Sequence, residues 1–104
     1  MAEIGKASKE EIVALKAKYS EVYEIKSVRD DDVHYTYVKK PDLNIISAAA
    51  KYAESDPVQS GMIMFNSTRI AGSDAVVNDS EMVLGVIQYI GKLFKVIEAE
   101  GKKL

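Results

Sequence analysis

The spacing of apolar and polar residues divides the chain into an alternating first part and a helical second part. Two runs between residues 22 and 38 alternate in the way of strands with one face toward a core. Arg29-Asp30-Asp31-Asp32 lies between the runs, and Asp side chains favour turns because they accept hydrogen bonds from nearby backbone. The pattern predicts a β-hairpin of residues 22–28 and 33–38. An isolated hairpin is marginal in water, so a helix must cover it or another chain must pair with its edge.

A short helix is predicted before the hairpin. Ser8 and Glu11 have the spacing of a capping box, in which each side chain accepts a hydrogen bond from the other residue's backbone N–H. The helix that starts there extends to about Tyr19. Its narrow apolar face consists of Ile12, Leu15 and Tyr19. Residues 1–7 offer little apolar surface for docking, so we expect a flexible N-terminus.

The predicted hairpin ends and the predicted helices begin at Lys39-Lys40-Pro41-Asp42. Pro41 disfavours the helical region for the residue before it, and the Asp42 carboxylate can cap a new helix. We expect that helix over about residues 43–54. Its apolar stripe consists of Leu43, Ile46, Ala50 and Ala53. The small residues Ala48–Ala50 leave room for another helix or for the hairpin to approach closely.

A third helix is predicted over about residues 58–65, with Asp56 as its N-cap and Pro57 at its first position. Gly61 destabilises it by up to ~1 kcal/mol relative to alanine, so we expect it to be short or frayed. Its core residues are Met62, Ile63 and Phe65.

Residues 66–78 form the longest irregular stretch. We expect Ile70, Val76 and Val77 to point inward and Gly72-Ser73-Asp74 to turn at the surface. Long loops with their own apolar anchors are often functional, but a connector that packs back on the core explains the pattern equally well.

The last helix is the clearest element of the sequence. It begins near Asn78 or Asp79 and continues to about Ile97. Its apolar positions are Val83, Val86, Ile87, Ile90, Leu93, Phe94 and Ile97. Met82, Leu84 and Tyr89 widen this surface beyond one stripe, as in a helix that is central in its own domain or shared with another subunit. We favour burial within the fold.

These elements predict an α+β fold, in which an N-terminal short helix and a β-hairpin precede three helices, the last of them long. A chain of 104 residues fits one domain. We assign that domain to residues 8–104, after the flexible residues 1–7.

Composition and charge exclude several classes of function. The hydrophobic fraction of 47% and the charged fraction of 29% are those of an ordinary globular protein, and a net charge of −2 gives no footprint for nucleic acid or an anionic membrane. The chain has no cysteine, which removes disulfides and thiolate metal sites. No apolar run is long enough for a bilayer, and residues 1–6 lack the apolar region of a secretory signal. We therefore expect a soluble intracellular protein.

Side chains that could perform chemistry are few and scattered. His34 is the only histidine and has no acid–base or metal partner close in sequence, so a packed or surface histidine is the favoured interpretation. Asp30-Asp31-Asp32 lacks the ligand spacing and the glycine of an EF-hand loop. Neither a phosphate-binding loop nor a nucleophile elbow occurs. We predict no enzyme, and no catalytic, cofactor-binding or metal-binding residue.

Several short segments have a familiar order and spacing. They are Glu21-Val22-Tyr23-Glu24-Ile25, Tyr37-Val38-Lys39-Lys40-Pro41-Asp42, Ser47-Ala48-Ala49, Asp56-Pro57, Ala71-Gly72-Ser73-Asp74, Asn78-Asp79-Ser80-Glu81 and Lys102-Lys103-Leu104. In this order they resemble a family of small bacteriophage and prophage tail assembly chaperone-like proteins, over roughly residues 8 to 104. The family often has a Cys-Trp pair after Asn66, where this chain has Ser67-Thr68. A contact made by that aromatic residue is absent here or is replaced by Arg69 or Ile70.

The resemblance implies a non-catalytic protein that acts while a long phage tail is assembled. Such chaperones hold the extended tape-measure protein soluble, recruit tail-tube subunits and leave before the virion is complete. A location in the host cytoplasm and absence from the mature virion follow from the same resemblance. The alternatives are a structural or accessory virion component of the tail and a small interaction protein of prophage origin.

Partner-binding candidates come from the pattern and the resemblance together. They are Lys39, Lys40, Met62, Met64, Phe65 and Arg69. Methionine adapts to varied partners, and an apolar surface suits a helix bound in a groove, although core packing is the alternative for the three apolar candidates. The turn needs neither lysine, so both are free for an acidic partner segment. The hairpin edge and the wide last helix also allow a homo-oligomer.

Overall fold

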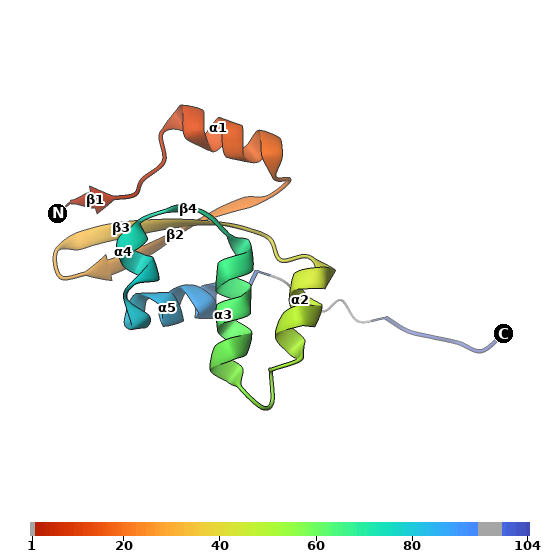
Figure 1. Cartoon of the computed structure of the whole chain (residues 1–104). Coiled ribbons are helices and arrows are strands. Elements are labelled where there is room, and N and C mark those ends of the chain that lie inside the picture. Colours follow the sequence, from red (N-terminus) through yellow and green to blue (C-terminus); the bar gives the residue numbers. More distant parts are fainter. Residues whose placement is uncertain (1, 94–98) are drawn as a thin grey trace.

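The chain is built around one mixed sheet of four strands, with helices on both sides of it (Figure 1). The computed structural model describes residues 2–93 and 99–104. In chain order the elements are β1 (Glu3–Ile4), α1 (Lys9–Lys18), β2 (Val22–Arg29), β3 (Asp32–Lys39), α2 (Leu43–Ala50), α3 (Pro57–Thr68), β4 (Arg69–Gly72), α4 (Asp74–Val77) and α5 (Ser80–Ile90). The predicted α+β class is confirmed.

β3 is the central strand and is paired along both edges. On one edge it pairs antiparallel with β2 over its whole length, from Arg29 opposite Asp32 to Val22 opposite Lys39. On the other edge its first half pairs in parallel with β1, and its second half pairs antiparallel with β4. The hairpin is thereby confirmed, and β1 and β4 within the same chain supply the edge partner that it needed.

The hairpin turn consists of Asp30 and Asp31, which separate the two strands. Asp30 has a φ of 56°, in the left-handed region that Asp tolerates better than most residues. The Asp-rich segment between the two runs is therefore a tight turn, as its composition predicted.

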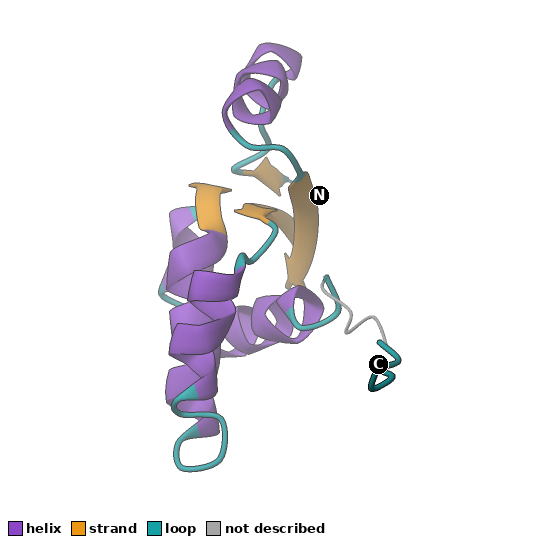
Figure 2. Cartoon of the chain, turned by 90° about the vertical axis from the view of Figure 1, so that its right-hand side faces the viewer, coloured by secondary structure: helices purple, strands orange, loops and turns teal. Residues whose placement is uncertain are grey.

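Residues 2–18 form an N-terminal arm. Its strand β1 joins the edge of the sheet, and α1 lies on one side of the sheet, while α2, α3 and α5 lie on the other (Figures 1 and 2). Part of the segment expected to be flexible, residues 1–7, lies against the sheet, where β1 pairs with β3 and the backbone N–H of Ala7 donates to the Tyr37 hydroxyl at 3.0 Å. Burial raises the pKa of Tyr37 to about 12, so its hydroxyl keeps its proton and donates to Glu24 at 2.7 Å. These bonds attach the arm to the sheet.

The capping box of α1 is confirmed, since Ser8 and Glu11 bond each other's backbone N–H groups. The apolar face predicted for α1 is only partly buried against the rest of the protein. Ile12, Leu15 and Tyr19 are half-buried, and no residue of α1 is fully buried.

The core lies between the sheet and the helices below it. Its buried apolar residues are Ile25, Val38, Ala49, Met64, Phe65, Val76, Met82, Val83, Val86 and Ile90. α2 packs on α3, where Ala49 is buried and its carbonyl accepts a hydrogen bond from the Ser60 hydroxyl at 2.8 Å. The close approach expected at the alanine run is thus confirmed. The apolar stripe predicted for this helix is wrong in part: Leu43, Ala50 and Ala53 are exposed, because α2 turns the side with Ile45 and Ala49 to the core.

α3 is longer than predicted and continues to Thr68. Asp56 caps it through the backbone N–H of Gln59, with Pro57 in the first turn. Gly61 does not shorten the helix, because it lies at the contact with α5. A Cβ atom at this position would lie 2.9 Å from Cγ2 of Ile87, so glycine lets the two helices approach.

The irregular stretch predicted over residues 66–78 is mostly regular. α3 occupies its beginning, β4 pairs with β3, and α4 follows. Ser73 was expected at the surface but is buried, and its Oγ lies 2.9 Å from Nδ1 of His34. His34 is therefore a packed histidine. Val77 was expected to point inward but is 43% exposed.

α5 begins at the predicted place, with Asp79 as its N-cap. It ends at Ile90, earlier than the apolar pattern predicted, and is about as long as α3. Phe94 and Ile97, the last positions of that pattern, lie outside the described residues.

Candidate functional site

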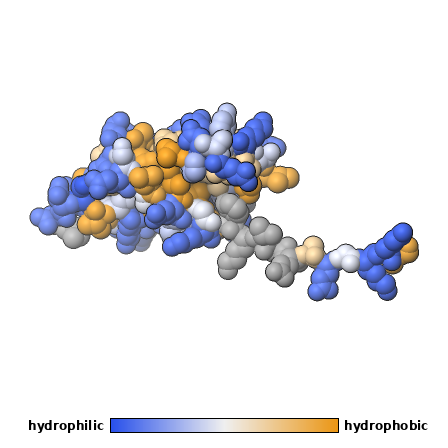
Figure 3. All heavy atoms as spheres, turned by 90° about the horizontal axis from the view of Figure 1, so that it is seen from below, coloured by the Kyte–Doolittle hydropathy of each residue, from blue (hydrophilic) through white to orange (hydrophobic). Residues whose placement is uncertain are grey.

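An apolar groove opens between the first turns of α3 and the α4–α5 corner. It has a volume of about 260 Å3 and is lined by Val58, Met62, Val77, Asn78, Ser80, Val83 and Leu84. Three of these side chains are unusually exposed for their size, with exposed fractions of 64% for Val58, 43% for Val77 and 50% for Leu84. Seen from below, apolar side chains gather in the middle of the helical side of the molecule, with polar side chains around them (Figure 3).

Helix packing explains the shape of the groove. α3 and α5 touch at Gly61 and Ile87, which is one turn beyond Val58 and Leu84. The buried Val83 and the half-buried Met62 lie at the bottom of the groove. α4 is a single turn that reverses the chain, so Val77 enters the same surface from a third element.

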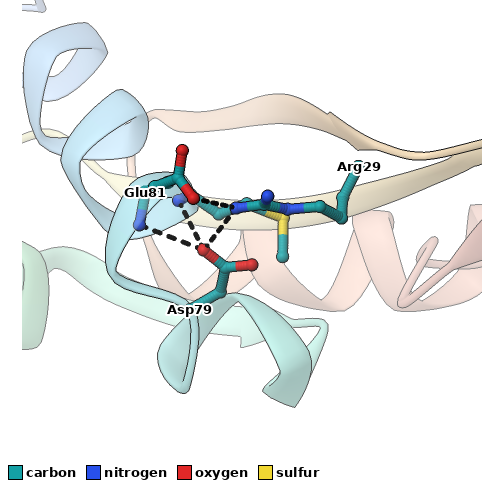
Figure 4. Close-up of polar contacts among 4 residues, drawn as sticks. Arg29, Asp79 and Glu81 are labelled. Atoms are coloured by element: carbon teal, nitrogen blue, oxygen red, sulfur yellow. Dashed lines mark hydrogen bonds and ion pairs between the residues drawn. The ribbon is translucent and has the colours of Figure 1, made fainter.

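The start of α5 is fixed by an ion-pair cluster (Figure 4). One oxygen of Asp79 accepts hydrogen bonds from the backbone N–H groups of Glu81 and Met82 at 3.0 and 3.1 Å. The same oxygen lies 2.8 Å from the Arg29 guanidinium, which also bonds Glu81 at 3.1 Å. The cluster joins the hairpin end of β2 to α5 and so holds the helix that forms one wall of the groove.

These contacts shift the ionisation of the cluster. The pKa of Asp79 is lowered, mainly by the backbone N–H of Met82 and further by the Arg29 guanidinium, which outweigh partial burial. The two carboxylates raise the pKa of Arg29. Asp79 is thus a charged N-cap at neutral pH, which also complements the positive end of the helix dipole.

Asp79→Ala is expected to lower the melting temperature at neutral pH, because α5 loses its cap and Arg29 loses a partner. The folded-state pKa of Asp79 is below the unfolded one, so this stabilisation is complete above the unfolded pKa and is lost as the pH falls through the folded pKa. The difference in melting temperature between wild type and variant should therefore shrink on acidification below about pH 4. Thermal unfolding followed by circular dichroism across this range measures it.

Asp79→Asn is the matched control, since asparagine caps a helix well but carries no charge. It should fall between the wild type and Asp79→Ala at neutral pH. A difference between wild type and Asp79→Ala that does not change with pH would contradict the role assigned to the carboxylate.

The structure separates the three apolar residues predicted to contact a partner. Met62 lines the groove. Met64 is buried and borders a smaller apolar cavity of about 210 Å3 between α2 and α3. Phe65 is only 1% exposed in the centre of the core, so in this conformation it is unreachable for a partner.

The three cationic candidates lie away from the groove lining. Lys40 forms an ion pair with Glu21 at 3.5 Å, and the Lys39 ammonium lies 5.6 Å from the centre of the Tyr19 ring. Both lysines thus contact the segment that links α1 to β2. Arg69 bonds the Gly72 carbonyl and the Asp74 carboxylate, which places it at the corner between β4 and α4.

Sequence reasoning missed Val58, Val77 and Leu84 as surface residues. The signal for Leu84 was present, since the last helix is apolar beyond one stripe. Burial was expected for Met82, Leu84 and Tyr89, but only Met82 is buried, whereas Leu84 and Tyr89 are 50% and 40% exposed. For Val58 and Val77 the local pattern does not distinguish a core position from a groove position.

The lining residues determine what the groove can do. Among the described residues that line it, Asn78 and Ser80 are polar and the others are apolar, so the groove can accept apolar side chains. Within residues 2–93 and 99–104, no group of His, Cys, Asp or Glu side chains is placed to hold a metal ion. Likewise, no helix of the described residues is long and apolar enough to cross a membrane.

The fold and the groove define a small α+β domain with an exposed apolar groove. A solved structure described as an uncharacterised protein, rbstp2171, from Bacillus stearothermophilus is similar to it, with a TM-score of 0.65 and 20% sequence identity over 88% of this chain and 99% of that chain. This likeness shows the fold alone. No protein-family model matches the chain, and no curated protein sequence matches it.

Proposed function

We propose that the protein is a non-catalytic tail assembly chaperone of a phage or prophage, which binds the tape-measure protein, the tail-tube protein or both. The observation that carries the proposal is the apolar groove, where Val58, Val77 and Leu84 are exposed around Met62. The resemblance of the ordered sequence segments to tail assembly chaperone-like proteins supports the same function.

The groove has the character of a site for an apolar helix face. A helix presents apolar side chains at i, i+3, i+4 and i+7, and a groove between two helices accepts such anchors. A volume of about 260 Å3 suits one or two large apolar side chains. Met62 at its bottom can adapt to different side chains, which suits a partner with a long helical sequence. Binding would cover apolar surface on both proteins and so keep the partner soluble.

Co-expression with the tape-measure protein from the same locus tests the proposal. We expect the two proteins to co-purify and the soluble yield of the tape-measure protein to rise. Leu84→Glu should weaken the complex at least about tenfold, because it places a charge in the apolar groove without lowering helix propensity. Isothermal titration with a purified tape-measure fragment measures the affinity.

Leu43→Glu is the matched control, since Leu43 is even more exposed but lies on α2, outside the groove. It should bind like the wild type. Failure of co-purification, or equal effects of the two variants, would reject the groove as the binding site. Mass spectrometry of purified particles separates the chaperone from an accessory tail component, because a chaperone should be absent from them.

A further inference from the structure

The outer edge of β2 is open. β2 pairs with β3 on its inner edge, and in the part of the chain that the structure describes no strand pairs with its outer edge. An open strand of this length is a template for another strand, because its outward N–H and C=O groups lack partners.

Hydrogen bonds on the far edge of β3 show which groups of β2 point outward. The backbone N–H of Val33 donates to Ala2, and the carbonyl of Tyr35 accepts from Ser73, both at 2.8 Å. These two residues of β3 therefore direct their backbone groups away from β2. In an antiparallel ladder, bonded and non-bonded pairs alternate, so the β2 residues opposite them point outward as well. By this alternation and the register, the outward residues of β2 are Val22, Glu24, Lys26 and Val28.

The side chains of the outward residues form a pattern that is complementary to itself when one copy is reversed. An apolar residue stands at each end, and an acidic and a basic residue stand between them. Glu24 and Lys26 are exposed, and neither forms an ion pair within the described residues. Val28 is 64% exposed. Charged residues often protect an edge strand, but two opposite charges at this spacing attract a second copy of the same edge.

We propose that β2 pairs antiparallel with β2 of a second copy, around a two-fold axis at Ile25. In this register Glu24 lies opposite Lys26 of the second copy, and Val22 lies opposite Val28 of the second copy, each pair occurring twice. All four residues have outward backbone groups, so the pairs that bring unlike charges together are also the hydrogen-bonded pairs. The interface is isologous, and it joins the two sheets into one.

Other registers of the two β2 strands are less stable, because they lose either the charge pairing or the hydrogen bonds. A shift by two residues places Glu24 opposite Glu24 of the second copy or Lys26 opposite Lys26 of the second copy, and like charges directly opposite are destabilising. A shift by one residue places outward backbone groups opposite inward ones, so the ladder cannot form. The arrangement at Ile25 is therefore the one that satisfies both the hydrogen bonds and the charges.

Space beside the edge allows this pairing. A groove of about 440 Å3 lies between β2 and α5 and is lined by Ile25, Met82 and Gly85 among others. Apart from its chain neighbours and the backbone of its own helix, no atom lies within 4 Å of the position of a Cβ atom on Gly85, so this side of α5 is open. Side chains at the edge of the second copy can therefore approach β2 on the helical side of the sheet without meeting α5. Self-pairing does not depend on the function proposed for the apolar groove, which has different lining residues.

A charge swap tests the register. The full-length wild type should show a concentration-dependent monomer–dimer equilibrium in sedimentation velocity. Glu24→Lys and Lys26→Glu should each weaken the dimer by roughly tenfold or more, because each turns two attractions into repulsions. An equimolar mixture of these two variants should form a heterodimer, since every lysine then faces a glutamate. The double variant E24K/K26E should dimerise like the wild type.

Two control variants change the net charge by the same amounts at positions away from the β2 edge. Glu10→Lys and Lys16→Glu lie on exposed positions of α1, and they should dimerise like the wild type. Circular dichroism shows whether each variant folds, since Glu24 also accepts the Tyr37 hydroxyl bond. If Glu24→Lys does not fold, amide hydrogen exchange of the wild type tests whether β2 pairs with a second copy. The outward amides of Glu24 and Lys26 should become protected as the concentration rises, whereas those of Ile25 and Ser27 are protected at every concentration.

Three results would overturn the proposal. One is a wild type that remains monomeric up to millimolar concentration, including the case in which its outward β2 amides are protected in the monomer by another segment of the same chain. Another is equal dimerisation of the wild type and both single variants. The third is a mixture of folded single variants that does not associate.

Discussion

Gly72→Ala is expected to lower the free energy of unfolding by at least ~3 kcal/mol. Gly72 has a φ of 127°, which L-residues rarely adopt. A Cβ atom on it would lie 2.4 Å from the carbonyl oxygen of Tyr35 and 2.8 Å from Cα of Thr36. Both atoms belong to the backbone of β3, which is held by strands on both edges and cannot move aside. The cost therefore combines backbone strain with overpacking.

Gly85→Ala is the control for this prediction, because it is the same substitution in open space. Apart from its chain neighbours and the backbone of its own helix, no atom lies within 4 Å of the position of the new Cβ atom, and the residue is inside α5. Alanine should stabilise the protein there by up to ~1 kcal/mol through helix propensity. Urea unfolding gives both values. Equal stabilities of the two variants would contradict the tight contact described between β4 and β3.

Phe65→Ala is expected to cost about 3–5 kcal/mol of stability, a large part of what a domain of this size has. Phe65 is 1% exposed and lies in the core between α3, the sheet and α5, so its removal leaves a cavity. Partner binding should fall as well, but only in proportion to the unfolded fraction. Denaturant unfolding and binding measured at low temperature separate the two effects.

Met62→Ala is the comparison that distinguishes a core residue from a binding residue. Met62 is half-buried at the bottom of the apolar groove, so its loss should cost less stability than that of Phe65 but more affinity per folded molecule. If Phe65→Ala kept the stability of the wild type but lost partner binding, Phe65 would be a partner contact and its assignment to the core alone would be contradicted.

The parts of the fold that could be predicted are those with a local cause. The capping box at Ser8 and the caps at Asp42 and Asp56 are formed by neighbouring residues, so their spacing in the sequence is sufficient. The hairpin likewise depends on alternation and on a turn of adjacent Asp residues. Fold class follows from these elements.

The short strands could not be predicted because their cause is distant. Glu3–Ile4 and Arg69–Gly72 have little β propensity of their own, and Gly72 argues against a strand. Each is a strand only because β3 presents unpaired backbone groups to it. Tertiary pairing also explains why the stretch at residues 66–78 is regular rather than a loop.

The apolar groove, too, could be predicted from the sequence only in part. Met62 is one of the positions that the sequence suggests for a partner contact, and the structure places it in the apolar groove. The walls of that groove come from three elements, and whether Leu84 points to the core or to solvent depends on the angle at which α5 crosses α3. Partner binding at the groove remains a prediction.

The divided edge of β3 has a consequence for how the molecule opens. β1 covers the first half of that edge with a two-residue strand, whereas β4 is continuous with α3 and α4. We therefore expect the N-terminal arm to detach while the rest of the sheet stays intact, at a free energy well below that of global unfolding, which amide hydrogen exchange would measure. Such an opening removes the arm's contacts with the hydroxyl groups of Tyr35 and Tyr37. The two faces of the sheet are thus covered in different ways, one by an arm that is attached through a two-residue strand and a few side-chain bonds, the other by the packed helices.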